Sequence, residues 1–258
     1  MALPQPNDGF EWTQAPWGTV LRCRPLLAVA DHFFSSSNLE LRDDRSEWQA
    51  VASEIGVDAE QVLLLRQVHG AATAVARRGR SSPWTRPEAD VAVTDDCASA
   101  IAVRVADCTP ILLGDSRLGV VGAAHAGWRG TVHGAASAAV RAMHESFGSK
   151  PADLVAAIGP CLGVCCGEVG PEVVTAFRDA GHPSASLARW FTAGIGDRSY
   201  LDLPLANRDQ VEAAGVPPAQ IHVAGLCTKT FAGVFHSYRA ARERAGRMVG
   251  IIRPRDGC

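Results

Sequence analysis

The sequence has no long hydrophobic run. Its apolar stretches all fall short of the roughly 18–20 residues that a helix needs to span a bilayer. The first eight residues also lack the basic start and the apolar stretch of a signal peptide. These two absences predict a cytoplasmic protein with no membrane partner.

Net charge is nearly absent as well. The 258 residues include 25 Lys and Arg against 27 Asp and Glu, a balance of −2. Nucleic-acid-binding proteins usually carry a basic face that neutralises phosphates, so the balance argues against a nucleic-acid partner. Apolar residues make up 47% and charged residues 20%, which is ordinary for a globular protein and excludes a disordered chain or a coiled coil.

Internal repeats and low-complexity segments are also lacking. Glycine and proline are spread along the whole chain, which indicates one domain with many short connections. Residues 1–17 contain three prolines and little periodicity, so we expect an irregular N-terminal arm there and a single domain over 18–258.

Strand-like segments outnumber helical ones and come in runs without strict alternation, which favours an α+β fold over a doubly wound one. The predicted helices cover residues 46–56, 131–147, 171–181 and 205–214. The predicted strands cover residues 21–30, 62–65, 72–76, 90–94, 101–105, 111–113, 118–124, 154–158, 221–224, 233–238 and 249–252.

What the sequence has in excess is cysteine. Eight cysteines are many for a cytosolic chain of this size, and in that compartment they stay reduced. Metal ligands, nucleophiles or buried apolar residues are therefore expected, rather than disulfides.

Three segments place reactive side chains at the ends of predicted strands, where a rigid sheet can present functional groups. They are Arg66–Gly70, Val105–Pro110 and Ala124–Thr131. Within them His69, Cys108 and His125 supply two imidazoles and one thiolate, and three such ligands with an open fourth position are typical of catalytic zinc. Taken alone, His69 is favoured as a capping or core histidine and Cys108 as a small buried apolar side chain, whereas the glycine-flanked turn weakens this alternative for His125.

The third segment also contains a candidate anion site. Gly127 and Gly130 flank Arg129 in a turn at a predicted helix start, where backbone N–H groups can face an anion and the guanidinium can bind phosphate. A surface ion pair is the alternative for Arg129. Asp107 could orient a ligand imidazole, act as a general base, or simply cap a strand end. Asp90 has the same ambiguity and ranks lower.

Another loop is rich in sulfur. Cys161, Cys165 and Cys166 could bind a second metal or form a redox pair, but the loop has no fourth Cys or His ligand, and adjacent cysteines make poor disulfides. We favour a structural loop lining the pocket. The remaining cysteines are expected to be packing residues or incidental: Cys23, Cys97, Cys227 and Cys258.

These segments, in this order, resemble the laccase-domain family, whose members were long described as multicopper polyphenol oxidases and are now regarded as purine nucleoside phosphorylases. The resemblance rests mainly on QVHG at 67–70, ADCTP at 106–110, HAGWRG at 125–130 and IGPC at 158–161. EVG at 168–170 and SYR at 237–239 are also similar. The similarity extends from residue 60 to the C-terminus.

The resemblance implies a β-sandwich of mixed sheets surrounded by helices, with zinc on His69, Cys108 and His125. It implies phosphorolysis of adenosine, inosine or guanosine to a base and ribose 1-phosphate, and adenosine deamination is linked to similar proteins. Asp107 and Arg129 would be catalytic. The residues that we expect to bind substrate or phosphate are Arg129, Gly130, Asn38 and Arg239, although an ordinary amphipathic edge strand is the favoured interpretation of residues 235–239.

The family's older oxidase description fails on the histidines. A multicopper oxidase needs paired His-x-His motifs, and no two of the eight histidines here are separated by one residue. A four-copper laccase centre is therefore rejected, although copper can bind a Cys/His₂ site.

The N-terminal third departs from the family. Residues 31–40 are compressed, and no arginine lies between Phe34 and Asn38. Gly167 stands where similar proteins commonly have an aromatic residue. These departures predict an altered substrate preference or a weak activity. Three rival functions stay open: a metal-free hydrolase with Cys108 as nucleophile, a peptidoglycan editing factor acting on muropeptide precursors, and a non-enzymatic cell-wall or division-associated partner.

Overall fold

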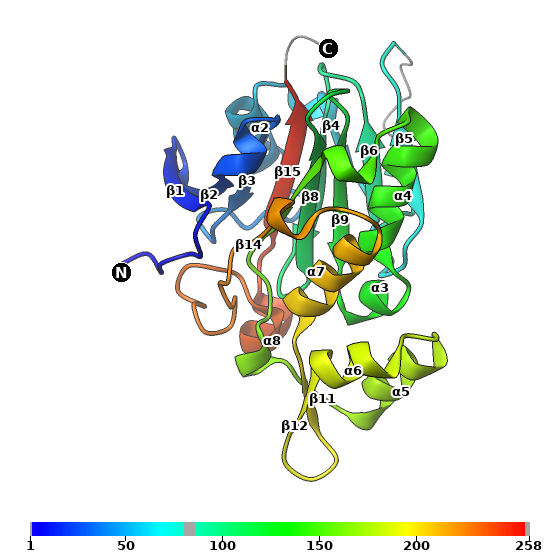
Figure 1. The fold of residues 1–258 in the computed structure, drawn as a ribbon. Coiled ribbons are helices and arrows are strands. Elements are labelled where there is room, and N and C mark those ends of the chain that lie inside the picture. Colours follow the sequence, from blue (N-terminus) through cyan, green and yellow to red (C-terminus); the bar gives the residue numbers. More distant parts are fainter. Residues whose placement is uncertain (1, 80–85, 256–258) are drawn as a thin grey trace.

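Two six-stranded β-sheets face each other in the computed structural model, which describes residues 2–79 and 86–255 (Figure 1). The first sheet has the strand order β1 (Phe10–Ala15), β2 (Gly18–Cys23), β3 (Ala30–Ser35), β15 (Met248–Pro254), β7 (Ala100–Val105) and β4 (Val62–Leu64). The second has the order β14 (Ile221–Val223), β10 (Leu154–Ile158), β8 (Thr109–Asp115), β9 (Val121–Ala126), β6 (Val91–Thr94) and β5 (Thr73–Ala76). Parallel pairs (β4–β7, β5–β6 and β10–β14) occur beside antiparallel ones, so both sheets are mixed.

The central strands lie between apolar layers on both sides. Phe34, Ile101 and Leu112 belong to the core between the two sheets. Every residue of β8 and β9 is buried. Strands that are covered on both faces need apolar side chains at consecutive positions, which explains the continuous runs in the sequence.

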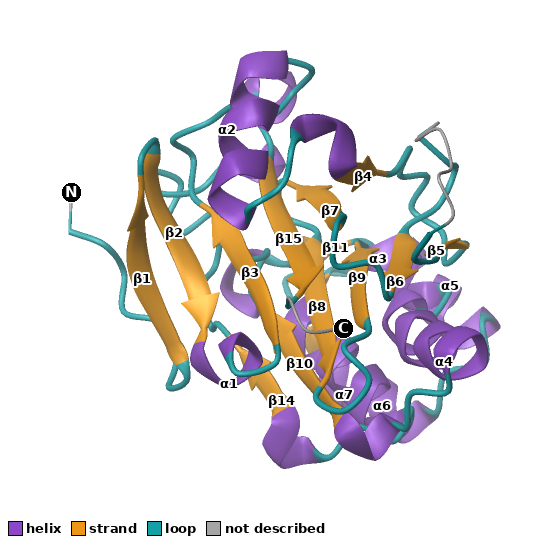
Figure 2. Ribbon diagram, turned by 90° about the horizontal axis from the view of Figure 1, so that it is seen from above, coloured by secondary structure: helices purple, strands orange, loops and turns teal. Residues whose placement is uncertain are grey.

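Helices cover the outer faces of the sandwich (Figures 1 and 2). Helix α2 (Arg45–Ile55) packs Trp48 and Val51 on the first sheet, and the Asp44 carboxylate caps it by accepting the N–H of Ser46. Helices α4 (Ala135–Phe147) and α7 (Leu203–Ala213) cover the second sheet.

A smaller layer packs below the second sheet. It contains α5 (Pro171–Asp179), α6 (Ser184–Trp190) and a three-stranded sheet of β11 (Glu168–Val169), β13 (Ser199–Leu201) and β12 (Phe191–Ala193). Phe177 and Trp190 form its core, with ring centroids 5.9 Å apart. The remaining helices are α1 (Arg24–Leu27), α3 (Trp128–Val132), α8 (Tyr238–Ala241) and the short 3₁₀ turns Ala59–Gln61, Pro151–Asp153, Val164–Cys166, Pro218–Gln220 and Arg242–Arg244.

Two connections that cross between the sheets decide where the reactive segments lie. β7 belongs to the first sheet and β8 to the second, so residues 106–108 bridge them. The segment from β4 to β5 makes the same crossing and contains His69. Residues far apart in the sequence therefore meet at one end of the sandwich.

The α+β sandwich is confirmed, but several local predictions are wrong. Residues 1–17 are not all irregular, because Phe10–Ala15 pairs with β2 as β1, and Trp12 stacks on Phe235 at 5.9 Å. The strand predicted over 21–30 stops at Cys23, since α1 begins at Arg24 and Pro25 lies in its first turn. The strand predicted over 233–238 is a turn, in which the N–H groups of Val234 and Phe235 both bond to the Phe231 carbonyl.

The helix predicted over 131–147 is broken into α3 and α4. Gly134, with φ 74°, adopts the left-handed conformation between them, and this interrupts the helix at that point. No helix within 2–79 or 86–255 is long and apolar enough to cross a membrane.

His32 predicts a pH dependence of stability. The side chain is fully buried, and its Nε2 accepts the N–H of Cys23 at 3.0 Å. Burial lowers the pKa of His32 from 6.5 to about 4. Between these values the unfolded chain binds a proton that the folded chain does not, so the free energy of unfolding should fall by about 2–3 kcal/mol from pH 7 to pH 4.5 through this residue.

Urea unfolding of the protein and of His32→Gln at several pH values measures this effect. The variant should show a shallower dependence on pH, whereas a variant of the exposed His133, His133→Gln, should keep the full slope. Identical slopes for the protein and His32→Gln would contradict the assignment.

Candidate metal and substrate site

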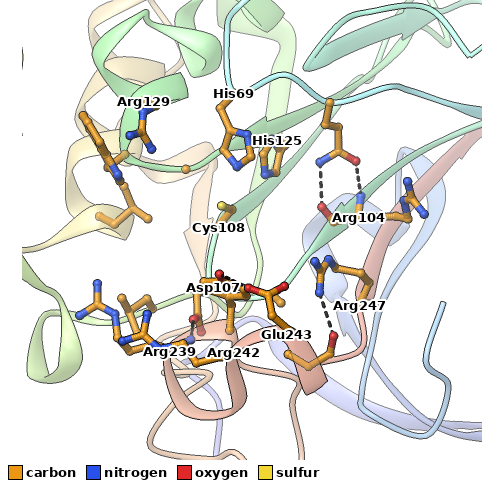
Figure 3. Close-up of a pocket in the computed structure, with 18 of the residues that line it drawn as sticks. His69, Arg104, Asp107, Cys108, His125, Arg129, Arg239, Arg242, Glu243 and Arg247 are labelled. Atoms are coloured by element: carbon orange, nitrogen blue, oxygen red, sulfur yellow. Dashed lines mark hydrogen bonds between the residues drawn. The ribbon is translucent and has the colours of Figure 1, made fainter. Parts of the chain in front are cut away.

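A cleft of about 850 Å³ lies where the two crossing connections meet (Figure 3). Its walls are rich in arginine and also contain the acidic residues Asp43, Asp107 and Glu243. The arginines that line it are Arg42, Arg66, Arg104, Arg129, Arg239, Arg242 and Arg247. The cleft therefore has a basic lining although the whole chain is close to neutral, and this favours an anionic ligand.

Three metal-binding side chains point toward one another in the cleft (Figure 3). The donor atoms of His69, Cys108 and His125 all lie within 4.8 Å of one another. His125 is buried, Cys108 is half-buried and His69 is exposed. The structure thus brings together the three residues that the sequence analysis proposed as ligands, and leaves the group open toward the cleft.

Asp90 organises two of these ligands. Its buried carboxylate lies 2.8 Å from His125 Nδ1, which leaves His125 Nε2 for a metal. The same carboxylate accepts backbone N–H groups from Val68, His69 and Gly70 at 2.7–3.2 Å. The pKa of Asp90 is lowered: burial alone would raise it, but the bonds from His125 and the backbone outweigh burial.

Asp90 was ranked too low from the sequence. The orienting role suggested for Asp107 belongs to Asp90, which immediately precedes β6 and is therefore beside His125 on the neighbouring strand β9. Its partners lie 20 to 35 positions away in the sequence. No local motif joins them, and only strand pairing makes them neighbours.

The loop that carries His69 is held in a specific shape. Gln67 donates to and accepts from the backbone of Arg104 at 2.8 and 2.9 Å. His69 has φ 62°, a conformation that non-glycine residues rarely adopt and that is often found at functional sites. The backbone at Gly127 lies so close that an added Cβ would be 2.7 Å from Cys108 Sγ. Gly127 therefore leaves room for the ligand sulfur.

The charged forms of Cys108 and His125 stabilise each other. Burial alone would disfavour the Cys108 thiolate, but the His125 and His69 imidazoles lower the pKa of Cys108 to about 6. Burial also disfavours the His125 cation, yet Cys108 and Asp90 raise the pKa of His125 to about 9. A thiolate is thus available at neutral pH, which is the form that binds metals.

Asp107 lies in the cleft wall beside Cys108 and also has a positive φ, 85°. Its Oδ1 accepts the Thr228 hydroxyl at 2.6 Å and its Oδ2 accepts the Arg239 N–H at 2.5 Å. These bonds join the crossing connection to the loop that contains Thr228 and to α8, and they fix the carboxylate.

The guanidinium groups of the two proposed arginines differ in how many hydrogen-bond partners they have. Arg129 stacks on Trp128, with its guanidinium 4.2 Å from the ring centroid, and this guanidinium has no hydrogen-bond or ion-pair partner among the described residues. Arg239 donates from Nη1 to the carbonyl oxygens of Cys166 and Glu168 at 3.1 and 2.9 Å. Both line the cleft, on different sides (Figure 3).

The structure does not place Asn38 or Gly130 in the cleft wall. Asn38 Oδ1 accepts the Ser36 hydroxyl at 2.5 Å and the Thr19 N–H at 3.3 Å, so it stabilises a turn outside the cleft. Gly130 is buried, and an added Cβ would lie 3.3 Å from the carbonyl oxygens of Gly70 and His125. Its small size permits close packing of α3 behind the ligands, whereas the sequence had suggested direct phosphate contact.

The sulfur-rich loop lies beyond Arg239. Cys161 is buried, while Cys165 and Cys166 meet a third thiol, Cys227, from the chain after β14. The interpretation of Cys227 as a packing residue is therefore incomplete. Cys258 is outside the described residues.

The fold and the site define a class: β-sandwich proteins with a two-histidine, one-cysteine group, suited to a metal, in a basic cleft. The chain belongs to the family described as multi-copper polyphenol oxidoreductase laccase, whose model matches residues 28–255.

Relatives with curated names are similar over most of the chain. The purine nucleoside phosphorylase YlmD of Geobacillus stearothermophilus is 35% identical over 235 residues, which are 86% of this chain and 85% of that protein. Adenosine deaminase RL5, from an unknown prokaryotic organism, is 37% identical over 79% of each chain. The crystal structure of the hypothetical protein YfiH of Bacillus licheniformis has a TM-score of 0.86 and 27% identity, and covers 96% of this chain and 100% of that one.

The position of Asp90 predicts its effect on metal binding. Asp90→Asn removes the negative charge that orients His125 and offers an NH₂ group to backbone donors. Loss of such an outer partner should weaken metal affinity roughly 10- to 100-fold. Chelator competition with Zn²⁺ as the probe measures this.

Asp209→Asn is the matched control, because Asp209 also accepts side-chain hydrogen bonds, from Trp190 and Arg189, but lies outside the cleft. The control should keep the affinity of the unmodified protein. An Asp90→Asn protein with unchanged affinity would show that the carboxylate does not support the ligands.

Proposed function

We propose that this protein is a zinc-dependent purine nucleoside phosphorylase, which converts adenosine, inosine or guanosine and phosphate into a free base and ribose 1-phosphate. The observation that carries the proposal is the convergence of His69, Cys108 and His125 in a cleft lined by seven arginines. The names of several relatives, YlmD among them, support the same reaction.

The donor set favours zinc. Two imidazoles and one thiolate leave a fourth position of a tetrahedral site open, and the exposure of His69 places that position toward the cleft. When bound, zinc polarises a phosphate oxygen or a water molecule. Asp90 keeps the His125 ring in the tautomer that presents Nε2, and Gly127 leaves space for the sulfur.

Arg129 is proposed to bind the phosphate. Its guanidinium is free of other polar partners in the described chain and is supported by the Trp128 ring, so it can form a bidentate contact without breaking an existing ion pair. Arg239 is proposed to hold the substrate from the opposite side, because its bonds to Cys166 and Glu168 fix its position.

Asp107 is proposed to act as a general base that accepts a proton from the bound phosphate. Each of its carboxylate oxygens already accepts one hydrogen bond and retains a further lone pair. The bonds from Thr228 and Arg239 hold the group at the cleft wall, where it can accept a proton from bound phosphate.

Adenosine deamination is the second candidate, favoured by the 37% identity to adenosine deaminase RL5. The same ligand group serves it, with a water molecule in place of phosphate. A nucleoside assay with and without phosphate separates the two reactions by product: adenine for phosphorolysis and inosine for deamination.

Removal of the ligand sulfur tests the zinc assignment. Cys108→Ala should lose nearly all bound zinc and nearly all phosphate-dependent release of base, measured by elemental analysis and chromatography. Cys97→Ala, which changes a thiol outside the cleft, should retain both. Retention of zinc and activity by Cys108→Ala would contradict the proposal. An unmodified protein that is active without bound zinc, together with loss of that activity in Cys108→Ala, would instead favour a cysteine hydrolase.

Neutralisation of Arg129 tests the phosphate site. A hydrogen bond to a charged group contributes about 1.5–3 kcal/mol, so Arg129→Met should raise KM for phosphate roughly 10- to 150-fold. Zinc content should not change. Arg178→Met, an exposed arginine of α5 outside the cleft, is the control and should leave KM unaltered. An unchanged KM in Arg129→Met would remove Arg129 from the phosphate site.

A further inference from the structure

A second group of metal-binding atoms lies outside the cleft's ligand group. The sulfurs of Cys165, Cys166 and Cys227 all lie within 4.8 Å of one another. Cys165 and Cys166 come from the 3₁₀ turn after β10, and Cys227 comes from the segment after β14. The nucleoside chemistry proposed above uses none of these three sulfurs.

Backbone pairing holds the two segments together. Cys161 and Cys227 form a β-bridge, in which the Cys161 N–H donates to the Leu226 carbonyl and the Thr228 N–H donates to the Cys161 carbonyl. The Cys166 N–H bonds to the Gly163 carbonyl at 3.0 Å within the turn. These main-chain bonds hold the two segments side by side and so bring the three sulfurs near one another.

The spacing suits one shared metal ion. A metal–thiolate bond of about 2.3 Å places two sulfurs of a trigonal or tetrahedral site roughly 3.8–4 Å apart. Cys165 Sγ and Cys166 Sγ are 3.8 Å apart. The Thr230 hydroxyl lies 3.4 and 3.6 Å from these two sulfurs and can donate to a thiolate.

The surroundings favour an anionic thiolate group. A cavity of about 460 Å³ beside Cys165 and Cys166 is lined by Arg198, Lys229, Arg239 and Arg242, with Glu168 as its one acidic residue. Positive charge stabilises thiolates. It also offsets the net negative charge that three thiolates retain after they bind a monovalent cation.

The number of ligands selects the ion. Among the described residues, no His, Asp, Glu or fourth Cys joins the three sulfurs. Structural zinc almost always takes four protein ligands, whereas thiolates alone suit copper(I), a soft ion. We propose that Cys165, Cys166 and Cys227 form a copper(I) site with three sulfur ligands, and that binding releases the thiol protons to solvent.

Copper(I) titration of the full-length protein tests the site. The reduced protein is titrated without oxygen in competition with bathocuproine disulfonate, and the bound metal is examined by X-ray absorption. Cys108→Ala, which disables the cleft's ligand group, should still retain one copper(I) per chain with sulfur as the only ligand type. Imidazole nitrogen in its shell would overturn the proposal, because it would place the metal on histidine.

Individual thiol variants identify the ligands in the Cys108→Ala background. Further replacement by Cys165→Ser or Cys227→Ser should release the copper to the chelator, while Cys97→Ser should not. Cys165 is exposed, so its variant tests the site even if a change at the buried Cys227 prevents folding. Copper retained by the folded Cys165→Ser protein, preference for zinc over copper(I), or disulfide formation without metal retention would each overturn the proposal.

Discussion

The buried Asp90 carboxylate is the interaction on which the site depends. One group receives the His125 ring and the backbone of the His69 loop, and so couples two ligands that lie on different elements. Burial of a charged carboxylate costs free energy unless hydrogen bonds pair its oxygens. The loop that contains His69 therefore adopts the shape that directs its N–H groups at Asp90. The positive φ of His69 fits this constraint, because the surrounding bonds define its conformation.

The fold gathers positively charged side chains in one place. The chain as a whole has a net charge of −2, yet seven arginines line one cleft. Several are held by carboxylates or carbonyl oxygens: Arg66 pairs with Glu88, Arg104 with Asp43, and Arg239 bonds to two carbonyls. Arg129 has the Trp128 ring as its support, and this leaves its hydrogen-bonding capacity for a ligand. The proposed thiol site shares Arg239 and Arg242 with the cleft, so the two sites border the same basic wall.

The sequence predicted those parts of the fold and the site that depend on neighbouring residues in the chain. Consecutive apolar residues indicated the strands of the core, and the three reactive segments at strand ends indicated His69, Cys108 and His125. Signals that depend on distant partners were missed. β1 is a strand because it pairs with β2. Residues predicted as a strand over 233–238 instead form a turn that hydrogen bonds to the Phe231 carbonyl close. Asn38 resembled a substrate residue, but its side chain stabilises a turn with Ser36 and Thr19.

The order of residues along the chain specifies which groups are available to the site: two imidazoles, one thiol, a glycine at 127 and an arginine at 129. Local propensity and the chemistry of these side chains need no knowledge of the fold. Which of these groups lie next to one another depends on how the two sheets pack. Strand pairing placed Asp90 beside His125, the crossing between sheets put Cys108 near His69, and a bridge between distant segments brought Cys227 to Cys165 and Cys166. The reason is physical, because the contacts that orient ligands join residues 20 or more positions apart, and burial of the two sheets against each other sets those contacts.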